Sequence, residues 1–374
     1  MPRLTDIIKQ GKIPEKEKEK DDSSRETISF KDLSLFKKSS KDFITPQDTD
    51  RDDSINAQFP KEIEKAHVEV ALEEMGDAKN LDWLYKNAYS FVEDTVSIAT
   101  NGGVLRIDEG IKIINQIVDN LDSIDSLYQK SIYTKETVDL FLSHPVNVVI
   151  YAMKIGVGLK YDRERLIKLG MGALLYDIGM VRIPKEILKV NRRLTEGESE
   201  IVKKHTRYGY EILLSLGEDY MWLAEIALQH HEREGGQGYP QGLKGDKIAE
   251  YAKVIGVVDI YDALIHSRPH RKRFLPYQAV KEIIKSEKGG FHPKIMKVLL
   301  THLSVFPLSS YVKLNSNAIG EVIAISENHP LRPTVQILYD SQGKRVQEKK
   351  IINLEDNNPL LYIIDSVFEE DFPV

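Results

Sequence analysis

The chain has 374 residues, of which 41% are hydrophobic, and this length and composition predict two or three domains with substantial cores. A formal net charge of −6 argues against a general nucleic-acid-binding surface, and the absence of cysteine excludes disulfides and thiolate metal sites. Because no apolar run reaches the length of a membrane span and the amino terminus lacks a signal-peptide core, we expect a cytoplasmic protein without membrane association.

The first 130 residues predict two segments of different character. Residues 1–60 carry mixed charge and little apolar periodicity, so they predict a disordered charged tail. Within it, residues 28–36 are either a short binding helix or a chance apolar cluster. Over residues 61–130 apolar residues recur at helical spacing, which predicts a helical N-terminal region. Its expected role is that of a scaffold and dimer contact, so a homodimer is a candidate assembly.

The central part of the chain carries a series of metal-ligating residue types in apolar surroundings. The pair His230-His231 is followed by the glycine-rich segment Gly235–Pro240, and imidazole is a common ligand of transition metals. Asp177 closes one apolar run and Asp259 interrupts another, and a carboxylate there needs a partner such as a cation. Each residue alone is more often a satisfied structural group, but the set together indicates a metal site.

The pattern changes to alternating β-forming residues after Thr301. Strands are predicted near residues 311–314, 320–325, 334–339 and 349–354, and Asp340–Gly343 has the composition of a turn between two of them. Residues 304–374 are therefore expected to form a small β domain whose function its residues do not reveal.

The segment from His144 to Thr301 resembles the HD-GYP family, a branch of the HD phosphohydrolase superfamily known for metal-dependent hydrolysis of cyclic di-GMP. Six landmarks carry the resemblance in order: His144-Pro145, Tyr176-Asp177, His205 with Gly209, His230-His231-Glu232 with Gly238-Tyr239-Pro240, Asp259 before Asp262-Ala263-Leu264, and Ser267-Arg268-Pro269 with Arg271. The resemblance implies a mainly α fold, with an all-helical HD-GYP core over residues 131–303 between the helical region and the β domain. It also implies a role in bacterial signal transduction.

The resemblance implies a ligand set for two metals. Asp177 would bridge them and be the central catalytic carboxylate, and three histidines would complete the first site: His205, His230 and His231. The second site would be built from His144 and Asp259. The family's third ligand there, a histidine, is replaced by Tyr176, which is a candidate phenolate ligand or a residue that only hydrogen-bonds or fills space. We therefore expect one tight divalent transition metal, iron or manganese, and a weaker second site.

A further departure concerns the substrate phosphate. The lysine that the family places three residues after the aspartate is Met180 here, and Arg182 is a candidate replacement. Arg268 and Arg271 are candidate phosphate-binding residues, with a basic helix end as the alternative. Gly238, Tyr239 and Pro240 are expected to line the substrate-facing rim and to contact signalling protein partners, although such a segment alone indicates only a turn.

Three functions remain open at this point. The first is a phosphodiesterase that opens cyclic di-GMP to the linear dinucleotide or to GMP. The second is a catalytically lapsed effector that binds metal and cyclic di-GMP and signals through protein partners, which Tyr176 and Met180 favour. The third is a hydrolase of another phosphate ester, because HD folds serve several substrates.

Overall fold

The computed structural model describes residues 78–133, 140–190, 192–267, 272–286, 289–303, 305–326, 329–356 and 360–373. The tail predicted over residues 1–60, including the segment 28–36, lies outside these residues, as do Arg268 and Arg271. Among the described residues, no helix combines the length and apolar character that crossing a membrane requires.

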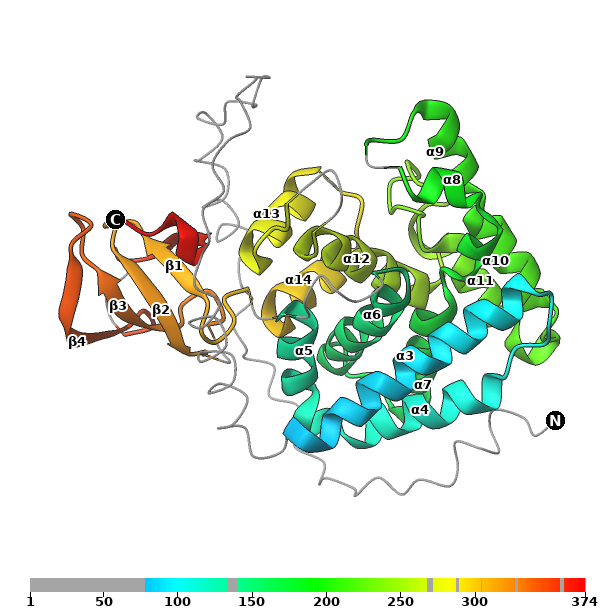
Figure 1. Cartoon of the computed structure of the whole chain (residues 1–374), viewed down its shortest axis with the longest axis horizontal. Helices are drawn as coiled ribbons and strands as arrows, with labels where there is room; N and C mark the ends of the chain where they lie inside the picture. The colour runs from blue at the N-terminus through cyan, green and yellow to red at the C-terminus, as the bar shows by residue number, and fades with distance from the viewer. Residues whose placement is uncertain are drawn as a thin grey trace. The chain divides into compact units, whose positions relative to one another are not determined.

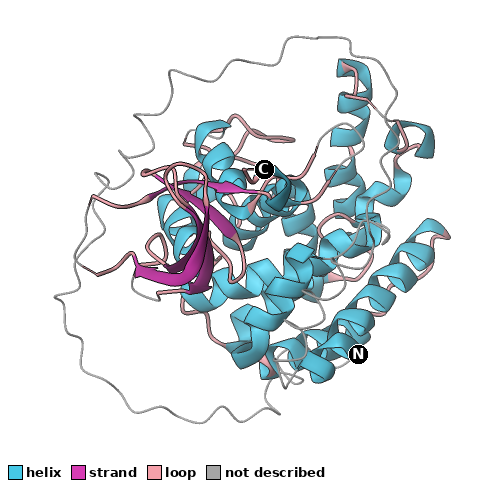
Figure 2. Cartoon of the chain, turned by 60° about the vertical axis from the view of Figure 1, so that its left-hand side comes forward, coloured by secondary structure: helices cyan, strands magenta, loops and turns pink. Residues whose placement is uncertain are grey.

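Helices make up the described chain up to residue 302, and an antiparallel sheet follows (Figures 1 and 2). The fold is therefore mainly α with a small C-terminal β domain, as the sequence predicted. The helices are α3 (Ala78–Thr100), α4 (Ile107–Asp119), α5 (Ile124–Tyr133), α6 (Leu140–Gly158), α7 (Arg163–Leu175), α8 (Lys185–Leu188), α9 (Glu196–Lys203), α10 (His205–Leu214), α11 (Met221–Gln229), α12 (Glu250–Ile265), α13 (Pro276–Ser286) and α14 (Pro293–His302).

Local sequence signals explain where several of these helices begin. The Asp162 side chain caps α7 by accepting a hydrogen bond from the Arg165 backbone N–H. Helix α9 starts with a capping box, in which Thr195 and Glu198 each accept from the other's backbone N–H. These caps satisfy N–H groups that have no partner within the helix, so they fix the start of each helix.

The core of the helical part lies around α6, α7 and α12, which pack against one another. Apolar residues of α6 from Val148 to Met153 are almost completely buried, and so are Val254–Val258 of α12. Helices that are buried on most of their surface have nearly continuous apolar sequences. The few polar groups that these helices carry inside the core, Asp259 and Asp262 among them, are therefore the residues that require an explanation.

The sheet has the strand order β4-β3-β2-β1-β5, and all neighbouring strands are antiparallel. Its strands are β1 (Tyr311–Leu314), β2 (Ile319–Ala324), β3 (Thr334–Tyr339), β4 (Arg345–Asn353) and β5 (Ile363–Val367). The predicted turn over residues 340–343 connects β3 to β4. Gly343 has φ +79°, a left-handed conformation that glycine adopts without the steric cost of a Cβ.

Two features of the sheet differ from the sequence-based expectation. Strand β4 starts at Arg345, several residues earlier than predicted, and it is largely exposed on both faces, so no alternation of burial marks its start. Strand β5 was not predicted. It pairs with β1 across about fifty residues of chain, and a pairing this distant leaves no local sequence signal.

Candidate metal centre

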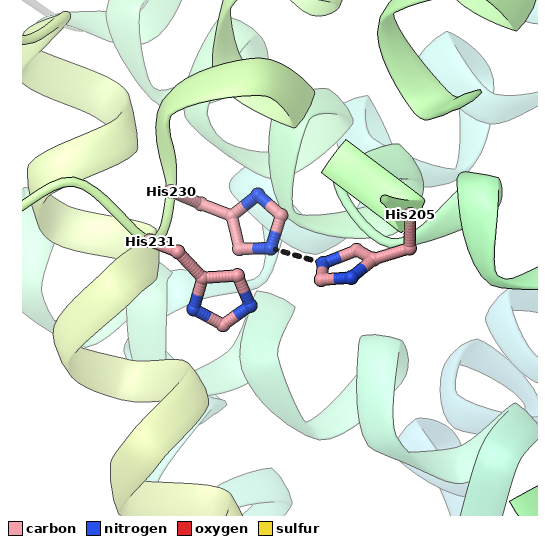
Figure 3. A group of neighbouring side chains, drawn as sticks. All are labelled: His205, His230 and His231. Atoms are coloured by element: carbon pink, nitrogen blue, oxygen red, sulfur yellow. Dashed lines mark hydrogen bonds between the residues drawn. The ribbon is translucent and has the colours of Figure 1, made fainter. Parts of the chain in front are cut away.

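Three histidines from two neighbouring helices converge at the centre of the helical part (Figure 3). His205 is the first residue of α10, and His230 and His231 directly follow α11. One ligand nitrogen from each lies within 4.8 Å of those of the other two. His205 and His230 are buried, whereas His231 is half-buried. The adjacent histidines reach one place because they lie at the end of their helix, where the backbone turns.

The hydrogen bonds of His205 and His230 leave two nitrogen lone pairs facing each other. His205 Nδ1 lies 2.7 Å from the Val202 carbonyl and His230 Nδ1 lies 2.9 Å from the Ala227 carbonyl. Because a carbonyl can only accept, both Nδ1 atoms carry the proton. The Nε2 atoms of the neutral rings are then bare, and they lie 3.2 Å apart. Two lone pairs at this distance repel each other unless a cation lies near both, so the donor set fits a transition metal.

Burial keeps His230 and His231 neutral. Burial, with a further contribution from the neighbouring His205, lowers the pKa of His230 to about 3. Burial, and then the proximity of His230, also lowers the pKa of His231 well below its usual value. Neutral imidazole is the form that binds a metal, so His230 and His231 need not lose a proton to do so at neutral pH.

Asp177 lies next to this cluster. It follows α7 and begins the short 3-10 helix η3 (Ile178–Arg182), and its Oδ1 is 3.4 Å from His205 Nε2. The approach depends on Gly179, because a Cβ there would lie 1.9 Å from the His205 carbonyl oxygen. The aspartate and the histidine that the sequence assigned to one site are thus brought together by the packing of η3 on α10.

A second group forms around Asp259 of α12. Its Oδ1 lies 2.9 Å from His144 Nε2 of α6, and the Tyr176 hydroxyl donates a hydrogen bond to the same oxygen at 2.9 Å. Burial, reinforced by the charge of Asp259, raises the pKa of Tyr176 well above its usual value. Tyr176 is therefore a protonated phenol that donates to Asp259.

His144 lies between two carboxylates, and the second was not assigned a role from the sequence. Asp262 Oδ2 is 2.5 Å from His144 Nδ1, so both ring nitrogens of His144 face acceptors. Burial lowers the pKa of His144, but the charges of Asp262 and Asp259 and their hydrogen bonds outweigh it and raise the pKa to about 10. A proton consequently lies between His144 and Asp259, and a metal bound there would have to displace it.

The sequence contains a signal that Asp262 lies beside the second group. It stands three residues after Asp259 in the apolar helix α12, so the two carboxylates occupy nearly the same helix face. Asp262 also lies 3.1 Å from His266, whose Nε2 in turn contacts the Ser131 carbonyl at 2.9 Å. Asp262 therefore links His144 to α5.

The segment Gly238-Tyr239-Pro240 folds back onto the histidine pair. The Tyr239 ring stacks on His231, with ring centroids 4.6 Å apart and an interplanar angle of 24°. A Cβ on Gly238 would lie 2.4 Å from the His231 carbonyl oxygen, so only glycine fits at this approach. The segment thus lies beside the histidine pair, and its expected roles at the substrate-facing rim and in partner contacts stay predictions.

Glu232 fixes this segment. Its buried carboxylate accepts hydrogen bonds from the backbone N–H groups of Gln241 and Leu243, at 2.7 and 2.9 Å. Although Glu232 directly follows the two histidines, its oxygens are used to hold the loop that carries Tyr239. The sequence signal was an acidic residue beside the pair, but which backbone groups it would meet depends on the loop conformation.

The candidate replacement for the missing lysine is engaged elsewhere. Arg182 is exposed, its Nη1 lies 2.6 Å from Glu211, and its guanidinium lies over the Tyr208 ring. Met180 is half-buried and carries no charge. The structure therefore gives no support to Arg182 as a phosphate ligand.

Comparison with protein families agrees with this arrangement. Residues 118–295 match the family model of the HD domain, and residues 311–373 match a KOW domain associated with the HD domain. The chain carries an HD domain, in agreement with the HD-GYP resemblance of its sequence. The HD-domain match begins at residue 118, so it includes α5, whose Ser131 carbonyl contacts His266 behind the second group.

Curated relatives of this HD-domain chain are named as phosphodiesterases of cyclic dinucleotides. A cyclic di-GMP phosphodiesterase of Pseudomonas aeruginosa is 27% identical over 56% of the chain and 51% of the relative. The cyclic di-GMP phosphodiesterase PdeB of Borreliella burgdorferi is 29% identical over 58% of the chain and 56% of the relative. The 3'3'-cGAMP-specific phosphodiesterase 2 of Vibrio cholerae is 33% identical over 44% of the chain and 32% of the relative. The chain spans about half the length of the first two.

Proposed function

We propose that this HD-GYP protein is a metal-dependent phosphodiesterase that hydrolyses cyclic di-GMP to the linear dinucleotide or to GMP. The observation that carries the proposal is the pair of bare Nε2 atoms of His205 and His230, 3.2 Å apart, with Asp177 beside them. The relatives named above as cyclic di-GMP phosphodiesterases support the choice of substrate.

The tight metal, iron or manganese, would be held by Asp177, His205, His230 and His231. When bound, such a metal polarises a phosphodiester and makes water acidic enough to attack it at neutral pH. The chain's own residues would exclude bulk water through the burial of His205 and His230. The second, weaker site would use His144 and Asp259, and it is weaker because a proton and the Tyr176 hydroxyl already occupy the Asp259 oxygen.

Substrate binding is assigned to the rim of the site. Tyr239 offers an aromatic ring beside His231, and Gly238 and Pro240 shape the loop that carries it. Arg268 and Arg271 remain proposed phosphate ligands on the basis of the family resemblance alone.

Two alternatives follow from specific observations. The hydroxyl of Tyr176 donates to Asp259 and Met180 supplies no cation, which favours a catalytically lapsed effector that binds metal and cyclic di-GMP. A relative that is named for 3'3'-cGAMP favours a different cyclic dinucleotide as substrate, within the wider alternative of another phosphate ester.

The remaining expectations belong to the same proposal. They are a cytoplasmic location, a role in bacterial signal transduction, protein partners that contact the Gly238–Pro240 loop, and a homodimer formed through the helical N-terminal region. The acidic net charge of the whole chain supports the expectation that nucleic acid is not a partner.

A direct assay separates the three functions. The purified chain, loaded with manganese or ferrous iron, is incubated with cyclic di-GMP and with 3'3'-cGAMP, and products are separated by chromatography. The proposal expects linear dinucleotide or GMP from cyclic di-GMP. Binding without product would favour the lapsed effector, and faster hydrolysis of 3'3'-cGAMP would correct the substrate.

A further inference from the structure

A cationic side chain lies over the aromatic ring that stacks on one histidine of the cluster. Of the three clustered histidines, His231 is the half-buried one. The Tyr239 ring stacks on His231, and Lys203 Nζ lies 5.5 Å from the centroid of the Tyr239 ring. Lys203, Tyr239 and His231 therefore follow one another from solvent to the cluster.

We propose that Lys203 binds a phosphate of the cyclic dinucleotide substrate while Tyr239 contacts the adjacent sugar or base. This inference rests on the proposed function and adds Lys203 to its proposed phosphate-binding residues. An ammonium group serves as a point charge for phosphate.

Three other cations in the described part of the chain have partners of their own. Arg233 is buried and donates to the carbonyls of His230 and Glu232. Lys253 pairs with Glu234 at 2.9 Å, and Arg182 pairs with Glu211. Lys203 pairs with Glu200 at 2.5 Å, but both side chains are exposed, by 41% and 68%. An ion pair this exposed has little net stability, so a phosphate can displace the carboxylate.

The adjacent Lys204 provides a matched control. It carries the same charge, is exposed, and lies at the junction after α9, where its side chain points in a different direction from that of Lys203. Comparing Lys203→Ala with Lys204→Ala therefore separates a specific contact from a general loss of positive charge. Lys203→Arg keeps the charge and serves as the conservative variant.

The test measures steady-state kinetics and equilibrium binding of cyclic di-GMP on the full-length, manganese-loaded protein. Lys203→Ala is expected to raise KM and Kd about tenfold with little change in kcat or metal content, because a contact to the bound phosphate is lost. Lys204→Ala should match the wild type, and Lys203→Arg should lie within about threefold of it.

A variant that is expected to tighten binding strengthens the test. Glu200→Gln removes the carboxylate that competes for Lys203, so it is expected to tighten binding by about twofold to fivefold. Glu196→Gln, an equal charge change at the start of the same helix, should leave binding unchanged.

The outcomes separate this inference from the proposed function. If the wild type binds cyclic di-GMP and Lys203→Ala behaves like Lys204→Ala, the inference is overturned while the function stands. If the wild type binds without turnover, phosphodiesterase activity is overturned and the binding data still decide the role of Lys203. Failure of the metal-loaded wild type to bind the dinucleotide overturns both.

Discussion

Glu232→Gln tests how the loop beside the metal centre is held. The carboxylate is 4% exposed and accepts two backbone hydrogen bonds. Glutamine keeps one accepting oxygen but turns an NH2 group toward the second backbone N–H, which loses its acceptor. A hydrogen bond to a charged group contributes about 1.5–3 kcal/mol, so we expect a loss of about 2–3 kcal/mol in the free energy of unfolding.

The expected loss can be measured by thermal unfolding of the metal-loaded chain. For a domain of this size a loss of about 2–3 kcal/mol corresponds to a fall in Tm of roughly 4–12 °C. Metal content should stay near the wild-type level, because α10 and α11 position the three histidines independently of the loop. The control is Glu225→Gln, an exposed glutamate of α11. Equal Tm values for the two variants would refute the role assigned to Glu232.

Three further predictions concern the metals and the chemistry. Tyr176→His combined with Met180→Lys should raise the rate of cyclic di-GMP hydrolysis at least about tenfold, which corresponds to lowering the barrier by roughly 1.4 kcal/mol. If a folded, metal-loaded double variant shows no gain, these two residues do not limit turnover. Asp262→Asn should lower the metal affinity of the second site roughly tenfold or more, because His144 loses a carboxylate partner. Elemental analysis at graded metal concentrations measures this affinity, and an unchanged second site would contradict the prediction. Removing metal with a chelator should lower Tm, because metal at a hundred times its Kd stabilises the native state by about 2.7 kcal/mol. An unchanged Tm would mean that no metal is bound to the folded chain.

The sequence was informative where the local pattern determines the structure. Apolar spacing predicted helices in the region that includes α3 and α4, and the turn over residues 340–343 was recognised from its composition. Ordered family landmarks identified residues that the fold brings together, including Asp177 with His205 and His144 with Asp259.

The parts that were missed depend on contacts between distant segments. Strand β5 is defined by its pairing with β1, and Glu232 has a role only because the loop returns its N–H groups to the carboxylate. Likewise, Lys203 lies over the ring of Tyr239, which belongs to a different segment of the chain and in turn stacks on His231. Periodicity and propensity describe neighbours along the chain, so they do not report such contacts.

Elemental analysis of the purified protein and of Asp177→Ala tests the central claim most directly. The wild type should retain about one tightly bound transition metal per chain, with a second lost on dialysis. Asp177→Ala should lose both, because this carboxylate is assigned to serve the two sites, whereas His329→Ala, an exposed histidine that contacts Glu355 in the β domain, should retain the wild-type content. Wild-type metal content in Asp177→Ala would contradict the assignment of the metal centre.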